Sequence, residues 1–262
     1  MNHRQTRWLL IVAGTILWAI LIYTSYYVIH KPLDPANLRA LANLAGDLAT
    51  WLALLAVAMA LGSRLTRRLA YHSLLERLTF STGLGLSLFS VVTLGLGLAG
   101  LLYRWLFWAL LVVGGILLWP EFRELGRALR RVSWHRPKGA WQIFLSIFIA
   151  STLILALLLT LTPPTEWDSL TYHLVGPDRY AQAHRLTYEF DIYYLFFPSF
   201  TEMLFTAGVV LKGDIVPRLL HFSYLVLTVG ALGAFAARHW ERRQGLTAAA
   251  LFLSIPTALQ IA

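Results

Sequence analysis

Long apolar runs constrain this chain more than any other feature of its sequence. The run WQIFLSIFIASTLILALLLTL covers residues 141–161 without a charge, and several others approach the same length. A helix needs about 20 apolar residues to cross the hydrocarbon core of a bilayer. Only 13% of the 262 residues are charged, against about 25% in soluble domains. The sequence therefore predicts an all-α, polytopic membrane bundle.

About seven membrane-spanning helices are predicted from these runs. An eighth run, 195–211, contains Glu202 and is shorter, so we expect a partly embedded helix there, joined to short juxtamembrane helices outside the membrane. Gly83, Gly85, Gly95, Gly97 and Gly100 are expected to allow close helix packing in the third span. The predicted spans are 8–29, 44–63, 79–102, 105–119, 140–162, 217–237 and 246–262.

Basic residues predict the orientation, because cytoplasmic loops retain Lys and Arg. With a cytoplasmic N-terminus, 15 of the 22 Lys and Arg residues lie on the inner side. The seven on the outer side are Lys31, Arg39, Arg104, Arg179, Arg185, Lys212 and Arg218. This distribution accounts for the net charge of +9 without a nucleic-acid partner. We expect a bacterial-type inner-membrane protein in which residue 163 emerges on the external face.

Two regions follow from the composition. Residues 1–138 form a four-helix membrane region that ends in a basic amphipathic stretch, with Phe122, Leu125, Leu129 and Val132 at helical spacing. Such a stretch suits an interfacial helix lying on anionic lipid. Residues 139–262 form the second region. We read the N-terminal run as an uncleaved anchor and expect that the chain, which stops on apolar residues, is truncated.

The segment 163–194 carries the candidate site. Pro163 and Pro164 end the preceding helix, and Thr165 is placed to cap a short helix over 166–175, followed by a second over 177–186. Carboxylates at the mouth of a hydrophobic helix can act as general bases, which makes Asp168 and Glu166 candidates. The alternative for both is a helix cap that interacts with the helix dipole.

Other polar residues are weaker candidates. Tyr172 shares a helical face with Asp168, and Arg218 shares one with His221 at the start of a span. An arginine there, or Arg179, can bind phosphate oxygens, although Arg218 can also reach the interface as an ordinary flanking residue. His173 is a candidate metal ligand or an interfacial packing residue. Its spacing from Asp168 is poor for co-ligation, and cysteine is absent, so no metal or other cofactor is expected.

Two blocks of sequence resemble a known family. PPTEWDSLTYHLVGPDRYAQAHRL and FPSFTEMLFTAGVVLKGDIVPRLLHFSYLVL are similar to polyprenyl-phosphate-sugar-dependent glycosyltransferases of the GT-C class. The likeness is to their bacterial branch, related to protein O-mannosyltransferases and aminoarabinose transferases, and covers roughly residues 139–262. The family places an acid in its first external loop, directly after a membrane helix, and Asp168 occupies that position with Glu166 beside it.

The resemblance implies an inverting transfer on the external face. Asp168 would take a proton from an acceptor hydroxyl while a sugar leaves its polyprenyl phosphate, and a cationic group would stabilise that phosphate. Tyr172, His173, Arg179, Arg218 and His221 are the expected substrate-binding residues. The implied partners are a lipid-linked sugar donor, membrane lipids and an unidentified acceptor.

Two other functions stay open. A transporter or flippase for lipid-linked substrates would place functional charges within its spans, whereas most acids of this chain lie outside them. A non-catalytic membrane subunit is the third reading, and it follows from the expected truncation.

Overall fold

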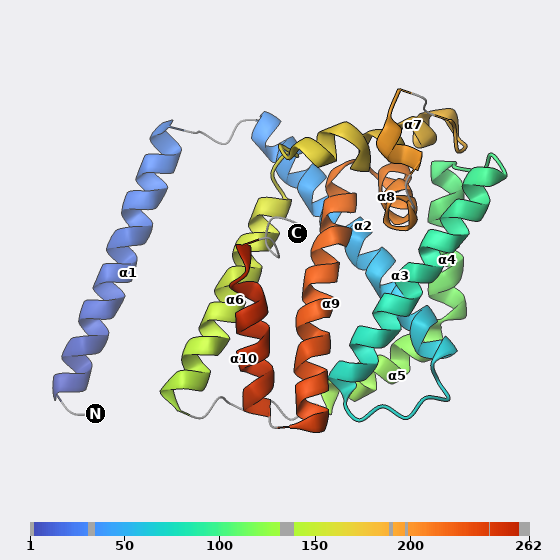
Figure 1. Ribbon diagram of the computed structural model, residues 1–262. Helices are drawn as coiled ribbons and strands as arrows, with labels where there is room; N and C mark the ends of the chain where they lie inside the picture. Colours follow the sequence, from blue (N-terminus) through green and yellow to red (C-terminus); the bar gives the residue numbers. More distant parts are fainter. Residues whose placement is uncertain are drawn as a thin grey trace. The chain divides into compact units, whose positions relative to one another are not determined.

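The computed structural model describes residues 3–30, 35–131, 139–188, 191–196, 199–240 and 242–256 (Figure 1). These residues form helices and contain no strand, in agreement with the all-α prediction. The chain divides into two compact units, residues 1–46 and 47–262. The first unit contains α1 (His3–His30) and the start of α2 (Pro35–Leu65).

The second unit contains the rest of α2 and all later elements. Its α-helices are α3 (Leu74–Leu98), α4 (Arg104–Leu117), α5 (Trp119–Arg130), α6 (Ala140–Thr160), α7 (Val175–Ala183), α8 (Phe200–Leu211), α9 (Ile215–His239) and α10 (Arg242–Leu253). Two short elements lie among them, the π-helix η1 (Ser169–His173) and the 3-10 helix η2 (Tyr193–Phe196).

Membrane character is borne out by helix length and composition. Among the described residues, five helices are long and apolar enough to cross a membrane, namely α1, α2, α3, α6 and α9. They match five of the predicted spans. The predicted span 105–119 corresponds to α4, which has only 14 residues and meets α5 at a 65° bend. The predicted span 246–262 overlaps α10, and its last residues, 257–262, lie outside the described part of the chain.

The total of about seven spans and the orientation therefore stay predictions. The predicted boundary after residue 138 also lies outside the described residues, which omit 132–138 and with them Val132 of the amphipathic stretch. The described part of that stretch is α5, where Leu125 is buried and Leu129 is exposed. Pro120 lies in the first turn of α5, where a missing N–H costs nothing, and it accompanies the change of direction.

Backbone contact between α2 and α3 forms one wall of the core. A Cβ added to Gly62 would lie 1.8 Å from the Ser81 carbonyl oxygen, and one added to Gly85 would lie 1.8 Å from that of Ala58. Gly85 thus fulfils the prediction of close packing, which missed Gly62. Gly83 and Gly95, also predicted, have open space around them.

The short helix α8 is the most buried element. It packs against α3, α7 and α9, and every residue from Glu202 to Gly208 is buried. Its 12 residues span about 18 Å, less than a bilayer core, as the short run predicts, and its partial embedding stays a prediction. α6, α9 and α10 lie side by side (Figure 1). The second unit has α7 at one end and α5 at the other, here called the α7 end and the α5 end.

Candidate functional site

The C-terminal end of α6 is held by an arginine from another helix. α6 ends at Thr160, and the Arg218 guanidinium, from the first turns of α9, donates hydrogen bonds to the carbonyl oxygens of Thr162 and Leu159. The Thr162 carbonyl lies beyond the last helical residue, and the Leu159 carbonyl also accepts hydrogen bonds from the N–H and the hydroxyl of Thr162. The negative end of the helix dipole favours a cation beside both carbonyls. The Arg218 side chain is only 12% exposed, so it is a largely buried cap and not only an interfacial flank.

The loop that follows does not form the predicted α-helix over 166–175. Helical backbone begins at Trp167, and Ser169–His173 form a π-helix in which the Leu174 N–H donates to the Ser169 carbonyl at 3.1 Å. Asp168 stands at the N-cap position of this π-helix, but its side chain makes no capping hydrogen bond. The cap considered for Asp168 is therefore not formed. Short π-helical turns are rare and are often found at functional sites.

The second predicted short helix is present with shifted bounds. α7 runs from Val175 to Ala183, and it ends where His184 adopts a left-handed conformation with φ of 57°. The Leu195 side chain packs where a Cβ on Gly176 would lie, which fixes the approach of η2 to the start of α7.

A cavity of about 310 Å³ opens between this loop, α8 and α9. It contains five of the seven predicted site residues and adds six residues to them. The predicted residues in its lining are Glu166, Asp168, His173, Arg218 and His221, and the others are Ser169, Leu174, Thr201, Glu202, Phe205 and Pro217. Arg218 and His221 both line it, as their spacing on one helical face predicts.

Glu202 is the main residue that sequence reasoning did not select. His173 Nδ1 and Glu202 Oε1 are 2.7 Å apart, and the Glu202 side chain is 11% exposed. A carboxylate this buried requires a partner, and the His173 ring supplies it. The available signal was an acid within an otherwise apolar run, which bears both on whether the run spans the membrane and on the transporter alternative.

The two loop carboxylates differ in their surroundings. Glu166 Oε1 lies 3.7 Å from Arg218 Nη2, at the same guanidinium that caps α6. Asp168 is exposed, and its carboxylate makes no hydrogen bond or ion pair with the described part of the chain. Asp168 is thus the carboxylate of the lining that is open to accept a proton from a ligand.

Tyr172 lies beside the cavity, not in its lining. Its ring stacks on Tyr194 with centroids 4.8 Å apart and lies 4.1 Å from the His173 ring. Burial, and next the negative charges of Asp168 and Glu202, raise the pKa of the Tyr172 hydroxyl above its ordinary value. The field of both cavity acids therefore reaches this hydroxyl, which stays protonated at neutral pH.

Arg179 lies away from the cavity. Its guanidinium donates two hydrogen bonds of 2.9 Å to the two carboxylate oxygens of Asp191. This bidentate pair lowers the pKa of Asp191 below its ordinary value, chiefly through the hydrogen bond from Arg179. It ties α7 to the segment before η2, and a substrate-binding role for Arg179 stays a prediction.

Metal ligation has no support from side-chain geometry. Within the described ranges, no three His, Asp or Glu side chains come together as metal ligands. The expectation that the protein uses no metal stays a prediction.

Comparison with known proteins does not assign a family to this chain. The sequence matches no protein-family model, no curated protein and no solved structure.

Proposed function

We propose that this chain is a membrane glycosyltransferase module that transfers a sugar from a polyprenyl phosphate to an acceptor hydroxyl. The observation that carries the proposal is the Asp168 carboxylate, unpaired among the described residues, in a cavity that also contains Arg218. A base and a cation in one cavity next to the end of an apolar helix suit a reaction on a lipid-linked donor. The family resemblance of the same loop supports this reading.

At the anomeric carbon, the transfer forms one bond and breaks another. The acceptor oxygen bonds to the anomeric carbon as the bond between that carbon and the phosphate oxygen breaks, which inverts the configuration. The hydroxyl proton passes to Asp168, and the polyprenyl phosphate leaves with the electron pair. Arg218 and His221 are the groups we assign to the leaving phosphate, since both line the cavity from α9.

Two further residues set the positions of these groups. Glu166 pairs with Arg218 and so orients the guanidinium that we assign to the phosphate. The hydrogen bond between Glu202 and His173 fixes the His173 ring at the cavity wall. In this scheme the donor lipid lies among the helices, and the reaction takes place on the external face.

A donor-consumption assay tests the proposal without knowledge of the acceptor. Membranes containing the protein are incubated with a panel of polyprenyl-phosphate sugars, and release of polyprenyl phosphate is measured with and without candidate acceptors. Asp168→Asn should reduce the release from any donor that is used by at least ~100-fold, the scale of general-base catalysis. Asp178→Asn is the matched control, because Asp178 is exposed on α7 and, among the described side chains, its carboxylate accepts only from Gln182 on the same helix. Equal turnover by both variants would remove Asp168 from the role of base.

Transport of a lipid-linked substrate is the second candidate function. Glu202 is buried in a 12-residue helix, and transporters place charges at short or broken helices within the membrane. In reconstituted vesicles, a transporter would move intact lipid-linked sugar between leaflets and leave its glycosidic bond uncleaved. Movement without cleavage, abolished by Glu202→Gln but not by Asp168→Asn, would favour this candidate over the transferase.

A further inference from the structure

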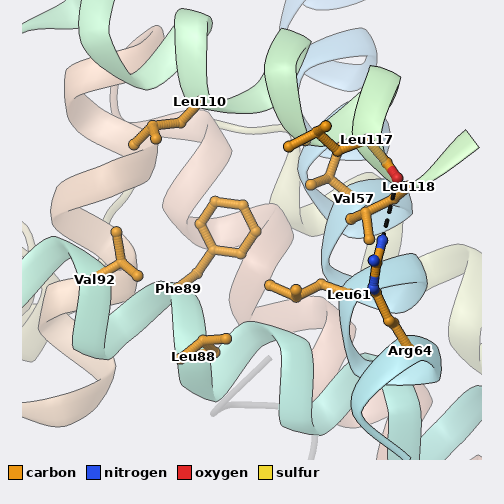
Figure 2. A pocket seen from close by; sticks show the side chains of 10 residues that line it. Val57, Leu61, Arg64, Leu88, Phe89, Val92, Leu110, Leu117 and Leu118 are labelled. Carbon is orange, nitrogen blue, oxygen red and sulfur yellow. Dashed lines mark hydrogen bonds between the residues drawn. The ribbon is translucent and has the colours of Figure 1, made fainter. Parts of the chain in front are cut away.

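A second cavity lies at the α5 end, away from Asp168. It is a groove of about 370 Å³ between α2, α3 and α4, and its lining is apolar except for Arg64 (Figure 2). Val57 and Leu61 come from α2, Phe89 and Val92 from α3, and Leu110 and Leu117 from α4. Figure 2 shows Phe89 at the centre, with Leu110 and Val92 on the side away from Arg64.

Within the described residues, Arg64 has unused hydrogen-bonding capacity at the mouth of this groove. Its side chain is 56% exposed, and the one hydrogen bond that it donates there, of 3.3 Å, goes to the Leu117 carbonyl at the end of α4. The Glu121 Oε1 carboxylate oxygen is 3.9 Å away, beyond hydrogen-bond distance. A guanidinium carries five N–H donors, so most of this group stays open to an anion.

The same end has the marks of a membrane interface. Trp119 is the first residue of α5 and is 61% exposed, as is usual for tryptophan at the level of lipid headgroups. α5 then leaves the direction of α4 at 65°, which suits a helix lying along the membrane surface. A guanidinium at this depth can reach a lipid phosphate.

The charges of α5 are sorted between its two faces. Its acids point inward, since Glu121 is buried and Glu124 accepts a hydrogen bond of 2.8 Å from Arg77 on α3. Arg123, Arg127 and Arg130 are exposed. The outer face of α5 is therefore cationic, although the helix contains acids, and it favours anionic over zwitterionic lipid.

We propose that the groove binds an anionic phospholipid, with an acyl chain between α2, α3 and α4 and the headgroup phosphate on Arg64. The groove extends over residues 57–64 of α2 and 110–117 of α4, about 10 Å along each helix, so it holds a segment of one acyl chain. On binding, the Arg64 guanidinium forms charge-assisted hydrogen bonds to the phosphate in place of its weak ion pair with Glu121. This site is separate from the Asp168 cavity and does not depend on the proposed transferase activity.

Removal of the Arg64 charge is the first test. The purified protein in neutral detergent is titrated with phosphatidylglycerol or phosphatidylcholine, and lipid adducts are counted by native mass spectrometry. Arg64→Gln should weaken phosphatidylglycerol binding about tenfold and reduce its advantage over phosphatidylcholine to the part that the cationic face of α5 supplies. The control is Arg68→Gln, which removes an equal, exposed charge outside the groove and should cost much less. Equal losses in both variants would mean general charge attraction and would overturn the site.

Filling the groove is a test that leaves Arg64 in place. Val92→Trp enlarges a side chain of the lining, whereas Val91→Trp makes the same change at its exposed neighbour outside the lining. Only Val92→Trp should reduce phosphatidylglycerol binding. Soluble glycerol phosphate should bind neither variant nor the wild type, because it has no acyl chain. Binding of glycerol phosphate, or unchanged lipid binding by Val92→Trp, would contradict a lipid site.

Glu121 supplies the opposite prediction. Because the Glu121 carboxylate lies near Arg64 and repels an anion, Glu121→Gln should strengthen phosphatidylglycerol binding several-fold. If the ion pair were purely structural, its loss would weaken lipid binding or leave lipid binding unchanged. Weaker or unchanged binding, with the melting temperature preserved, would show that Arg64 serves only the protein and would overturn the proposal.

Discussion

The two ends of the second unit use their carboxylates differently. At the α5 end, Glu76 accepts from Arg238 and Glu124 from Arg77, both at 2.8 Å, so these acids tie α3 to α9 and to α5. At the α7 end, three acids and one arginine line a single cavity, and the Asp168 carboxylate is left without a partner among the described residues. Paired acids join helices, whereas an unpaired acid beside a cavity is available for chemistry. Four predictions test this difference.

Arg218 should give the largest effect, because it combines both uses of charge. Arg218→Gln removes the cap on α6 and the partner of Glu166, so we expect loss of any donor turnover by at least ~100-fold and a destabilisation of about 1.5–3 kcal/mol. Thermal unfolding in detergent and the donor-consumption assay measure the two effects. Arg218→Lys retains the charge without the planar fork and should recover only part of each. An effect on stability alone would show that Arg218 holds α6 in place and takes no part in the reaction.

Arg77 should affect stability without affecting the cavity. It donates to Ser63 at 2.7 Å and to Glu124 at 2.8 Å, and its side chain is 20% exposed. Since Glu124 is 43% exposed and partly screened, we expect Arg77→Gln to lower the unfolding free energy by about 1–2 kcal/mol. Thermal melts give this value, and donor turnover should stay at the wild-type rate per folded molecule. A matching loss of turnover would show that the two ends are coupled.

The pair of His173 and Glu202 should show a smaller coupling energy. Because the two groups share one hydrogen bond, the double variant His173→Gln and Glu202→Gln should lose about 1 kcal/mol less than the sum of the single losses. Thermal unfolding of the four proteins completes the cycle. Additive losses would mean that the contact contributes nothing to folding and would leave Glu202 as an isolated buried acid.

Asp191 should give the smallest effect, confined to acid. Its pKa is lowered in the fold by the hydrogen bond from Arg179, so the pair stabilises the loop above the ordinary Asp value of about 3.9 and is lost as pH falls through the lowered pKa. The protection of the amides of 179–188 against hydrogen exchange, relative to their intrinsic rate at each pH, should therefore fall below about pH 4 in the wild type. Asp191→Asn should show that lower protection already at neutral pH and little further change in acid.

Helix positions were predictable from sequence because apolar length and proline act locally. The runs behind α2, α3, α6 and α9 exceed what a soluble surface helix would carry, and Pro163 and Pro164 follow the end of α6. The shortness of α8 also followed from its run and its acid. The span count did not follow, because α4 has only 14 residues and α5, which has Pro120 in its first turn, leaves its direction at 65°.

Several residues of the site could be predicted from the sequence, but the contacts between them could not. Spacing placed Arg218 and His221 on one face, and both line the cavity. The pairing of His173 with Glu202 joins residues that are 29 positions apart, and the capping of α6 by Arg218 joins positions 56 apart, so local pattern could not reveal either. For the same reason Arg179, a reasonable phosphate ligand by type, was not predicted to pair with Asp191.

The π-helical turn at Ser169–His173 makes this loop sensitive to chain length. Its hydrogen-bonded ring, from the Ser169 carbonyl to the Leu174 N–H, encloses one residue more than an α-helical ring. Deletion of one residue, for example Leu170, would allow the turn to relax to α-helix and would rotate Asp168 by about 100° relative to His173. We therefore expect this loop to depend on its number of residues. Exchange of the exposed Leu170 side chain should be tolerated, whereas insertion or deletion of one residue should not.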